Sequence, residues 1–256
     1  SRTFRARFLK DGEGLDCDIK KVIVQKGACA ENFMPGTVYI PHIRAEVSNL
    51  SSLIENEELL LQIGLLLDDG TVEYTNQGYF TVSKPERTEF GVSFDAIGRI
   101  SSRLNVLPDL PNETTLENLA NAITQKTGVA IIVNGVTLDG TVTESMNGLT
   151  CKEILEVIVS VLGAFGSEDG EGNIVISKFS TTSTVDYNGD YTTTSPKFSD
   201  YNYTLSGIKV VSAMEYADDD GNTVPERAYA EGVPSLILNN AYMTEGLFAN
   251  FVQNTV

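Results

Sequence analysis

One stretch of this 256-residue chain, residues 57–99, constrains its fold more than any other. It opens with a long apolar run at 59–67, and an Asp-Gly pair follows at 69–70. Asp-Gly is typical of a tight hairpin turn, because glycine tolerates the positive φ that such a turn requires. Asn-Gln-Gly at 76–78 and Pro-Glu-Arg at 85–87 predict two further turns. The stretch therefore predicts four antiparallel strands in series, joined by short turns.

The last strand of this series shows the clearest periodicity. Phe90, Val92 and Phe94 alternate with polar residues, which is the pattern of a half-buried strand. A short helix over residues 96–102 is expected to follow it. On pattern alone, a meander of this kind is compatible with a β-sandwich or with a small β-barrel.

Further strands are predicted before this stretch, over residues 4–10, 15–25 and 38–47. Apolar residues occupy alternate positions in the second and third of them. Pro41 lies inside the third. Because proline cannot donate a backbone hydrogen bond, it indicates a sheet edge or a bulge there.

A linker with two prolines, Pro108 and Pro111, marks the clearest boundary of the chain, and a predicted helix follows it. Thr114 and Glu117 have the spacing of a capping box, in which the hydroxyl and the carboxylate each accept a backbone N–H at the start of a helix. Gly128 is the expected end of this helix, because glycine readily adopts the left-handed conformation found there.

A second helix is predicted over residues 149–162, and it opens with another capping box formed by Thr150 and Glu153. A strand is expected between the helices at 129–133, and a hairpin after them. Residues 112–180 are therefore predicted to form a small α/β module, with both helices on one face of a sheet.

The C-terminal third is predicted to return to β structure. A segment rich in Thr, Ser and Tyr at 181–200 is interpreted as a surface excursion. Strands are expected at 201–216, 223–230 and 236–238, and a final helix at 245–252.

The order and spacing of these pieces resemble the N-terminal part of phage tail hub proteins. This tail-tip and baseplate hub family includes the tail-associated lysins and late control protein D. The resembling pieces are the strand pair DDGTVEYTNQGYFTVSKPE at 68–86, the strand ending in Phe-Asp-Ala at 94–96, and the short helix after it. A proline-containing linker, a helix ending in glycine, a strand, a second helix opened by Leu-Thr and a hairpin follow in the same order. The resemblance covers roughly residues 37–215.

The resemblance implies an α+β, mostly β fold in three parts. Residues 1–106 would form an antiparallel, barrel-like tube domain, and residues 112–180 would form the α/β module packed outside it. Residues 196–256 would supply returning β-strands and a terminal helix, which start a second tube domain.

The resemblance also implies a structural role in the virion of a phage, a prophage or a related injection machine. In this family, three copies form a ring that closes the tail tube at the tail tip, after assembly in the host cytoplasm. The implied partners are the distal tail or tube protein, the tape-measure protein and further copies of the chain. Some hubs carry enzymes as separate downstream domains, and no such domain is recognisable here, so no enzyme is expected.

A net charge of −17 argues against duplex nucleic acid as a stable partner, because that partner favours clustered Lys and Arg. The plain interpretation of the charge is solubility. The resemblance suggests a second interpretation, an acidic channel wall past which DNA moves without binding. The sequence contains no run of 18 apolar residues, so it predicts no membrane span, and no signal peptide is recognisable. Because the chain begins with Ser1 and not Met, a longer natural chain stays open.

The sequence offers little support for catalysis. Its three cysteines, Cys17, Cys29 and Cys151, form no C-x-x-C motif and are odd in number, which favours free thiols. Cys151 lies in the first turn of a predicted helix, where a thiol pKa can fall. The one histidine, His42, lies far away in sequence and is interpreted as structural. We therefore expect no catalytic, cofactor-binding or metal-binding residues.

One turn has oxygen ligands at alternate positions, as a calcium loop does: Asp218, Asp220 and Asn222. The sixth position is Thr223 instead of glycine, and no glutamate stands at the twelfth, so a solvated turn is favoured. Whether this turn binds calcium is left open by the sequence.

An alternative function is an extracellular or periplasmic carbohydrate- or protein-binding module. Four tyrosines are close enough in sequence to form an aromatic surface for a glycan: Tyr187, Tyr191, Tyr201 and Tyr203. Packing in strands explains them equally well. Glycan hydrolysis would require two placed carboxylates, and 35 acidic residues give no means of choosing them.

Overall fold

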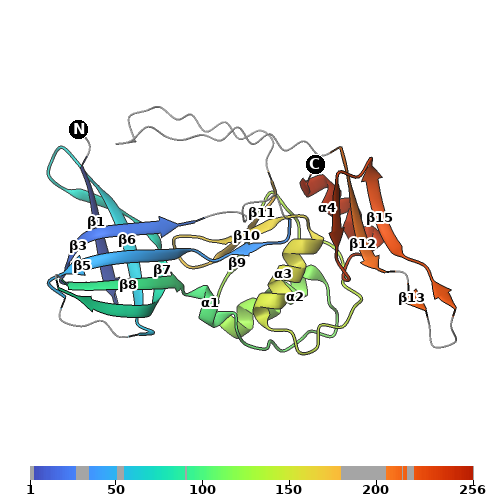
Figure 1. Ribbon diagram of the computed structural model, residues 1–256, viewed down its shortest axis with the longest axis horizontal. Helices are drawn as coiled ribbons and strands as arrows, with labels where there is room; N and C mark the ends of the chain where they lie inside the picture. Colours follow the sequence, from blue (N-terminus) through green and yellow to red (C-terminus); the bar gives the residue numbers. More distant parts are fainter. Residues whose placement is uncertain are drawn as a thin grey trace.

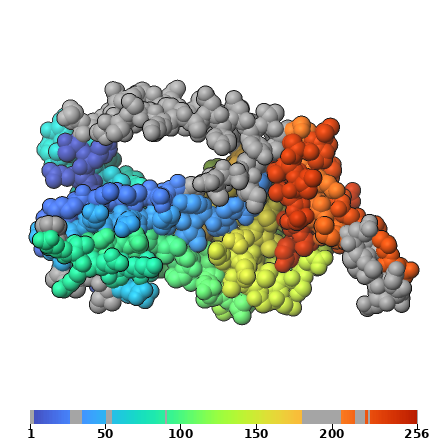
Figure 2. Space-filling view, in the orientation of Figure 1, coloured from blue at the N-terminus to red at the C-terminus, as the bar shows by residue number. Residues whose placement is uncertain are grey.

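The computed structural model describes residues 3–26, 35–50, 55–89, 91–179, 206–214, 216–217 and 222–255. The chain forms three parts along its long axis (Figure 1). A large antiparallel sheet lies at one end, a mixed α/β part lies in the middle, and a small sheet with the C-terminal helix lies at the other end. Figure 2 shows the middle part in contact with both of the others.

The large sheet has seven strands in the order β2-β1-β6-β7-β8-β5-β3, and every neighbouring pair is antiparallel. Its strands are β1 (Thr3–Lys10), β2 (Glu13–Gly14), β3 (Asp18–Gln25), β5 (His42–Ser48), β6 (Glu58–Leu66), β7 (Val72–Thr88) and β8 (Gly91–Gly98). The predicted turn at Asp69 and Gly70 is confirmed, because the Leu67 N–H donates to the Thr71 carbonyl across it at 2.8 Å and Gly70 has φ +84°.

The other two predicted turns are wrong, because β7 is one strand of 17 residues. Residues 76–78 contain a β-bulge, where Leu61 pairs with Gly78 and Gln62 pairs with Asn76. A second register shift follows, between Val82 and Lys84, and residues 85–87 continue the strand. A bulge accommodates turn-forming residues while the ladder continues on both sides of it. The predicted helix at 96–102 also shifts, because β8 extends to Gly98 and α1 spans Ile100–Arg103.

The predicted barrel is not confirmed, because the end strands β2 and β3 do not pair with each other. The sheet is nevertheless curled, since the rings of Phe8 on β1 and Phe94 on β8 lie 5.5 Å apart. Its concave face is filled by a hydrophobic cluster consisting of Phe8, Ile43, Ala45, Val47, Leu59, Leu61, Phe80, Val82, Val92, Phe94 and Ala96. The inside of the curled sheet is therefore a packed core.

The predicted strand at 38–47 is divided between two sheets at Pro41. Residues before it form β4 (Val38–Tyr39), which pairs in parallel with β10 (Phe165–Glu168) of the middle part, while residues after it form β5. The chain leaves the large sheet again after β8, and the crossing at 98–99 is adjacent to the one at 40–41, because the Gly98 N–H donates to the Pro41 carbonyl at 2.7 Å.

The middle part is a four-stranded sheet with two helices. The two helices, the strand between them and the hairpin after them follow the sequence prediction, whereas the fourth strand, β4, comes from outside the predicted module. The strand order is β4-β10-β11-β9, with β9 at Ile131–Asn134 and β11 at Ile174–Ser177, and the helices are α2 (Leu116–Thr127) and α3 (Cys151–Val161). The capping box of Thr150 and Glu153 is confirmed at the start of α3. The cap of α2 is one residue later than predicted, because the Thr115 hydroxyl accepts the Asn118 N–H at 3.2 Å.

The C-terminal part contains a three-stranded sheet, a short strand pair and a helix. The sheet order is β15-β12-β16, formed by Arg227–Gly232, Gly207–Ala213 and Leu236–Asn239, while β13 (Tyr216–Ala217) pairs with β14 (Thr223–Val224). The helix, α4, spans Glu245–Thr255. Buried residues of β12 and α4 belong to the same hydrophobic cluster as α2 and α3, and so do Val38, Ile100 and Leu104. The division of the chain into domains at 1–106, 112–180 and 196–256 remains a prediction.

Candidate functional site

The most unusual polar contacts lie where the seven-stranded sheet meets the β10–β11 hairpin, a region we call the junction. Arg99, which follows β8, is central to it. Its guanidinium lies 3.9 Å from the centroid of the Tyr79 ring, a cation–π distance. One terminal nitrogen donates to the Glu171 carbonyl at 2.9 Å, and the other lies 3.4 Å from a Glu58 carboxylate oxygen. Arg99 therefore connects strands β6 and β7 to the hairpin turn.

The bulge of β7 forms the second part of the junction. The Asn76 amide donates to a Glu171 carboxylate oxygen at 2.8 Å, and Asn76 itself accepts from the Gln62 amide at 2.6 Å. A Cβ on Gly170 would lie 2.5 Å from the Asn76 carbonyl oxygen, so the backbones approach closely. The bulge thus turns a polar side chain and a backbone carbonyl towards the hairpin, which explains the turn-like sequence at 76–78.

Glu168, the last residue of β10, is buried at the junction with 6% of its surface exposed. Both of its carboxylate oxygens are inaccessible and lack a hydrogen-bond partner among the residues that the structure describes. The carboxyl group occupies the space that a side chain would take at Gly98, next to Ile40 and Pro41. Burial raises the pKa of Glu168 to about 8, with Asp169 and Glu58 adding to the effect and Arg99 and Lys26 opposing it.

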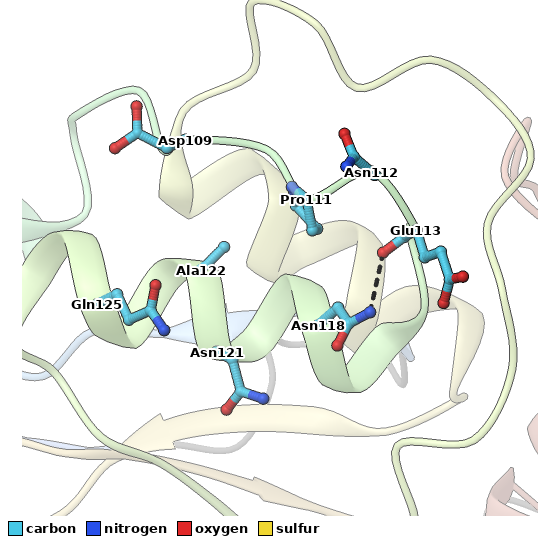
Figure 3. Close-up of a pocket in the computed structure, with 8 residues that line it drawn as sticks. All are labelled: Asp109, Pro111, Asn112, Glu113, Asn118, Asn121, Ala122 and Gln125. Atoms are coloured by element: carbon cyan, nitrogen blue, oxygen red, sulfur yellow. Dashed lines mark hydrogen bonds between the residues drawn. The ribbon is translucent and has the colours of Figure 1, made fainter.

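A polar groove of about 530 Å³ lies elsewhere, between the outer face of α2 and the preceding linker (Figure 3). Asn118, Asn121, Ala122 and Gln125 line it from the helix, and Asp109, Pro111, Asn112 and Glu113 line it from the linker. The Asn118 amide donates to the Glu113 carbonyl at 3.1 Å, whereas no hydrogen bond to another described residue joins the Asn121 or Gln125 amides. These amides can hydrogen-bond a polar ligand, and the lining includes no nucleophile paired with a base.

The structure does not bring the predicted catalytic candidates together. Cys151 is fully buried at the start of α3, where its backbone N–H donates to the Val106 carbonyl at 2.8 Å. Burial raises the pKa of its thiol, which opposes nucleophilic reactivity. His42 is exposed at the start of β5, opposite Ile97 and Gln25. Cys29 lies outside the described residues.

The proposed calcium turn and the tyrosine cluster fall mainly outside the described part of the chain. Asp218, Asp220 and all four tyrosines, Tyr187, Tyr191, Tyr201 and Tyr203, lie there, while Asn222 is described and exposed. Calcium binding by this turn and a glycan surface on the tyrosines therefore stay open. Within the described ranges, no group of three or more His, Cys, Asp or Glu residues could hold a metal ion. None of the helices described is long and apolar enough to span a membrane.

The negative charge is unevenly distributed along the chain. Residues 1–103, which contain the seven-stranded sheet, carry twelve Lys and Arg against fifteen Asp and Glu. Residues 104–256 carry six against twenty. The sheet is thus nearly neutral, and this distribution does not support an acidic wall formed by the predicted tube domain.

The curled sheet, the two-helix α/β part and the C-terminal sheet together define the fold of a phage tail protein. Three solved structures have it: the 43 kDa tail protein of prophage MuSo2 from Shewanella oneidensis, a tail protein from Neisseria meningitidis MC58, and prophage tail protein gp18 from Listeria monocytogenes EGD-e. Their sequence identities to this chain are 16%, 8% and 10%, with TM-scores of 0.55, 0.56 and 0.50. The matches cover 96%, 98% and 97% of this chain and 76%, 75% and 76% of theirs. No protein-family model and no curated protein sequence matches the chain.

Proposed function

We propose that this chain is a structural component of the tail of a phage, a prophage or a related injection machine, and that it acts in the hub at the tail tip. The observation that carries the proposal is the agreement of its fold, over 96–98% of its length, with three tail proteins. The resemblance of residues 37–215 to tail hub proteins supports the more specific position at the tip. In this role the chain works by assembly and not by catalysis.

The packed core of the sheet supports one arrangement of the channel in the proposed hub. Phe8, Phe80 and Phe94 fill the concave face, so a passage for DNA cannot run through a single sheet. The channel would lie between copies in a ring, with the outer faces of their sheets towards it. In the proposed assembly, neighbouring copies complete the barrel-like wall that one open sheet does not close. The proposed partners are copies of the chain, the distal tail or tube protein and the tape-measure protein.

Immunogold labelling tests the position in the virion. Antibodies against the purified chain should label one end of isolated tail particles, where the tip lies. Labelling along the whole tube would reject the hub position and retain a tail role. If the chain is absent from purified particles but abundant in the surrounding lysate, the proposal as a whole fails.

The groove on α2 favours a second candidate, a carbohydrate- or protein-binding module. Its unpaired Asn121 and Gln125 amides and its volume of about 530 Å³ suit a polar ligand. Among the described residues, no aromatic ring lines the groove to stack on a sugar, which makes this candidate weaker. A glycan-array signal that disappears in an Asn121→Ala, Gln125→Ala variant would favour it over the tail hub.

A further inference from the structure

We propose that Glu168 is a proton-dependent latch at the junction: the protonated carboxyl group lets the β10–β11 hairpin remain docked on the seven-stranded sheet, and ionisation weakens the docking. This inference concerns a single chain and does not depend on the tail hub function. It rests on the geometry around the carboxyl group, on the charges that face it and on the contacts that docking maintains.

The space around Glu168 suits a neutral carboxyl group. One of its oxygens occupies the place of a side chain at Gly98, and Ile40 and Pro41 stand beside it, each with a carbon 3.1 Å from that Cβ position. Neither oxygen has a hydrogen-bond donor within the described part of the chain. Ionising a carboxyl group that has no hydrogen-bond donors is costly in such surroundings. The Glu168 side chain therefore either stays protonated or becomes exposed to water.

Four charged groups from the surrounding elements face Glu168, two of each sign. Arg99 after β8 and Lys26 after β3 favour ionisation, whereas Asp169 in the hairpin turn and Glu58 on β6 oppose it. Arg99 is already engaged by the Glu171 carbonyl, Glu58 and the Tyr79 ring, and it forms no ion pair with Glu168. The Arg99 Nε likewise has no hydrogen-bond partner in the described part of the chain. The burial cost therefore prevails, and the proton is retained at neutral pH.

The carboxyl group is placed where its ionisation affects docking. It lies between the hairpin that carries it and the two chain crossings at 40–41 and 98–99. For water to reach it, the hairpin must separate from Gly98, which also strains the contacts of Glu171 with Asn76 and Arg99. Water can therefore solvate the Glu168 carboxyl group only when the junction opens.

The Glu168 carboxyl group has a different pKa in the docked and in the open junction, and this difference sets the direction in which pH changes docking. The pKa is about 8 in the docked state and near the ordinary glutamate value of 4.5 once the group is solvated, so docking retains a proton between these values. Docking is strongest at low pH, weakens as the pH rises from 4.5 to 8, and changes little above 8. For one proton, the docking equilibrium changes by about tenfold per pH unit within this window.

Hydrogen exchange of the hairpin backbone tests the latch. After correction for the intrinsic effect of pH, protection of residues 165–177 should fall by about tenfold per pH unit between pH 5.5 and 7.5. In a Glu168→Gln variant, whose amide is nearly the same size but cannot ionise, this fall should be absent. A Glu144→Gln variant is the matched control, because it removes an exposed carboxylate from the same α/β part, away from the junction, and should retain the fall.

Identical pH profiles for the unmodified chain and Glu168→Gln would overturn the proposal. If Glu168→Gln fails to fold, carbon-13 NMR of glutamate carboxyl groups in the unmodified chain decides the matter. A Glu168 titration midpoint near 8 supports the latch, and a midpoint near the ordinary glutamate value refutes it.

Discussion

Phe8 and Phe94 are in ring contact, with centroids 5.5 Å apart and planes tilted by 58°, although strands β6 and β7 separate their own strands in the sheet. Three strand spacings in a flat sheet would place them about 14 Å apart. The contact therefore requires the sheet to curl upon itself. It also closes the core of the β-rich part without hydrogen bonds between the end strands.

Replacing Phe94 by alanine should lower the free energy of unfolding of the sheet by about 3–5 kcal/mol, because the ring is fully buried and its removal leaves a cavity. Urea unfolding followed by tyrosine fluorescence measures the change. Phe4 on β1 offers the matched control. Its side chain is 51% exposed, and Phe4→Ala should cost less than about 1 kcal/mol. Equal losses in the two variants would contradict the packed concave face.

Gly163 should be far less tolerant of alanine than Gly128, although both have left-handed φ values, +62° and +70°. Alanine at 128 meets no atom within 4 Å and bears only the conformational cost, about 1 kcal/mol. Alanine at 163 would approach the Phe251 carbonyl oxygen on α4 to 2.7 Å. We expect Gly163→Ala to lose at least about 1 kcal/mol more, through poorer docking of α4. Thermal unfolding of both variants checks this, and equal losses would show that α4 adjusts freely.

Thr150→Ala should destabilise α3 by about 1 kcal/mol, because the hydroxyl accepts the Glu153 N–H and the Glu153 carboxylate accepts the Thr150 N–H. Thr143→Ala is the control at a nearby exposed threonine outside any helix. Chemical denaturation of the two variants gives the difference. A loss in Thr143→Ala as large as that in Thr150→Ala would remove the capping explanation.

The thiols of Cys17 and Cys151 should react slowly in the native chain. Burial raises the pKa of both, so little thiolate is present at pH 8, and Cys151 is also fully enclosed. Iodoacetamide labelling with peptide mapping should modify Cys151 only after unfolding. Rapid native labelling of Cys151 would contradict its burial and reopen the nucleophile hypothesis.

Local chemistry made some elements of the fold predictable and misled at others. The Asp69–Gly70 turn and the capping box of α3 follow from residues that contact one another within a few positions, so the sequence reveals them. The residues at 76–78 and 85–87 suit turns, but inside a long strand the same residues suit bulges and edges. The transfer of β4 to another sheet depends on its pairing with β10, more than 100 residues away, which no local pattern contains.

The sequence alone does not reveal the junction, because its residues come from segments that are far apart along the chain. Glu168 shares one face of its strand with Gly166, and Ile174 is its cross-strand partner. An acidic residue on the inward face of a hairpin is the one signal that sequence reading could have used. Its closeness to Gly98 and Arg99, and hence its pKa, follows only from the packing of two sheets.

The paired crossings at Pro41 and Gly98 have a mechanical consequence. Two of the covalent segments that join the sheet to the α/β part run side by side, held together by the Gly98 to Pro41 hydrogen bond. A single tether would let one part swivel about the other, whereas two adjacent tethers restrict twisting and share any pull between them. A pull on the seven-stranded sheet is thereby passed to the α/β part through both segments.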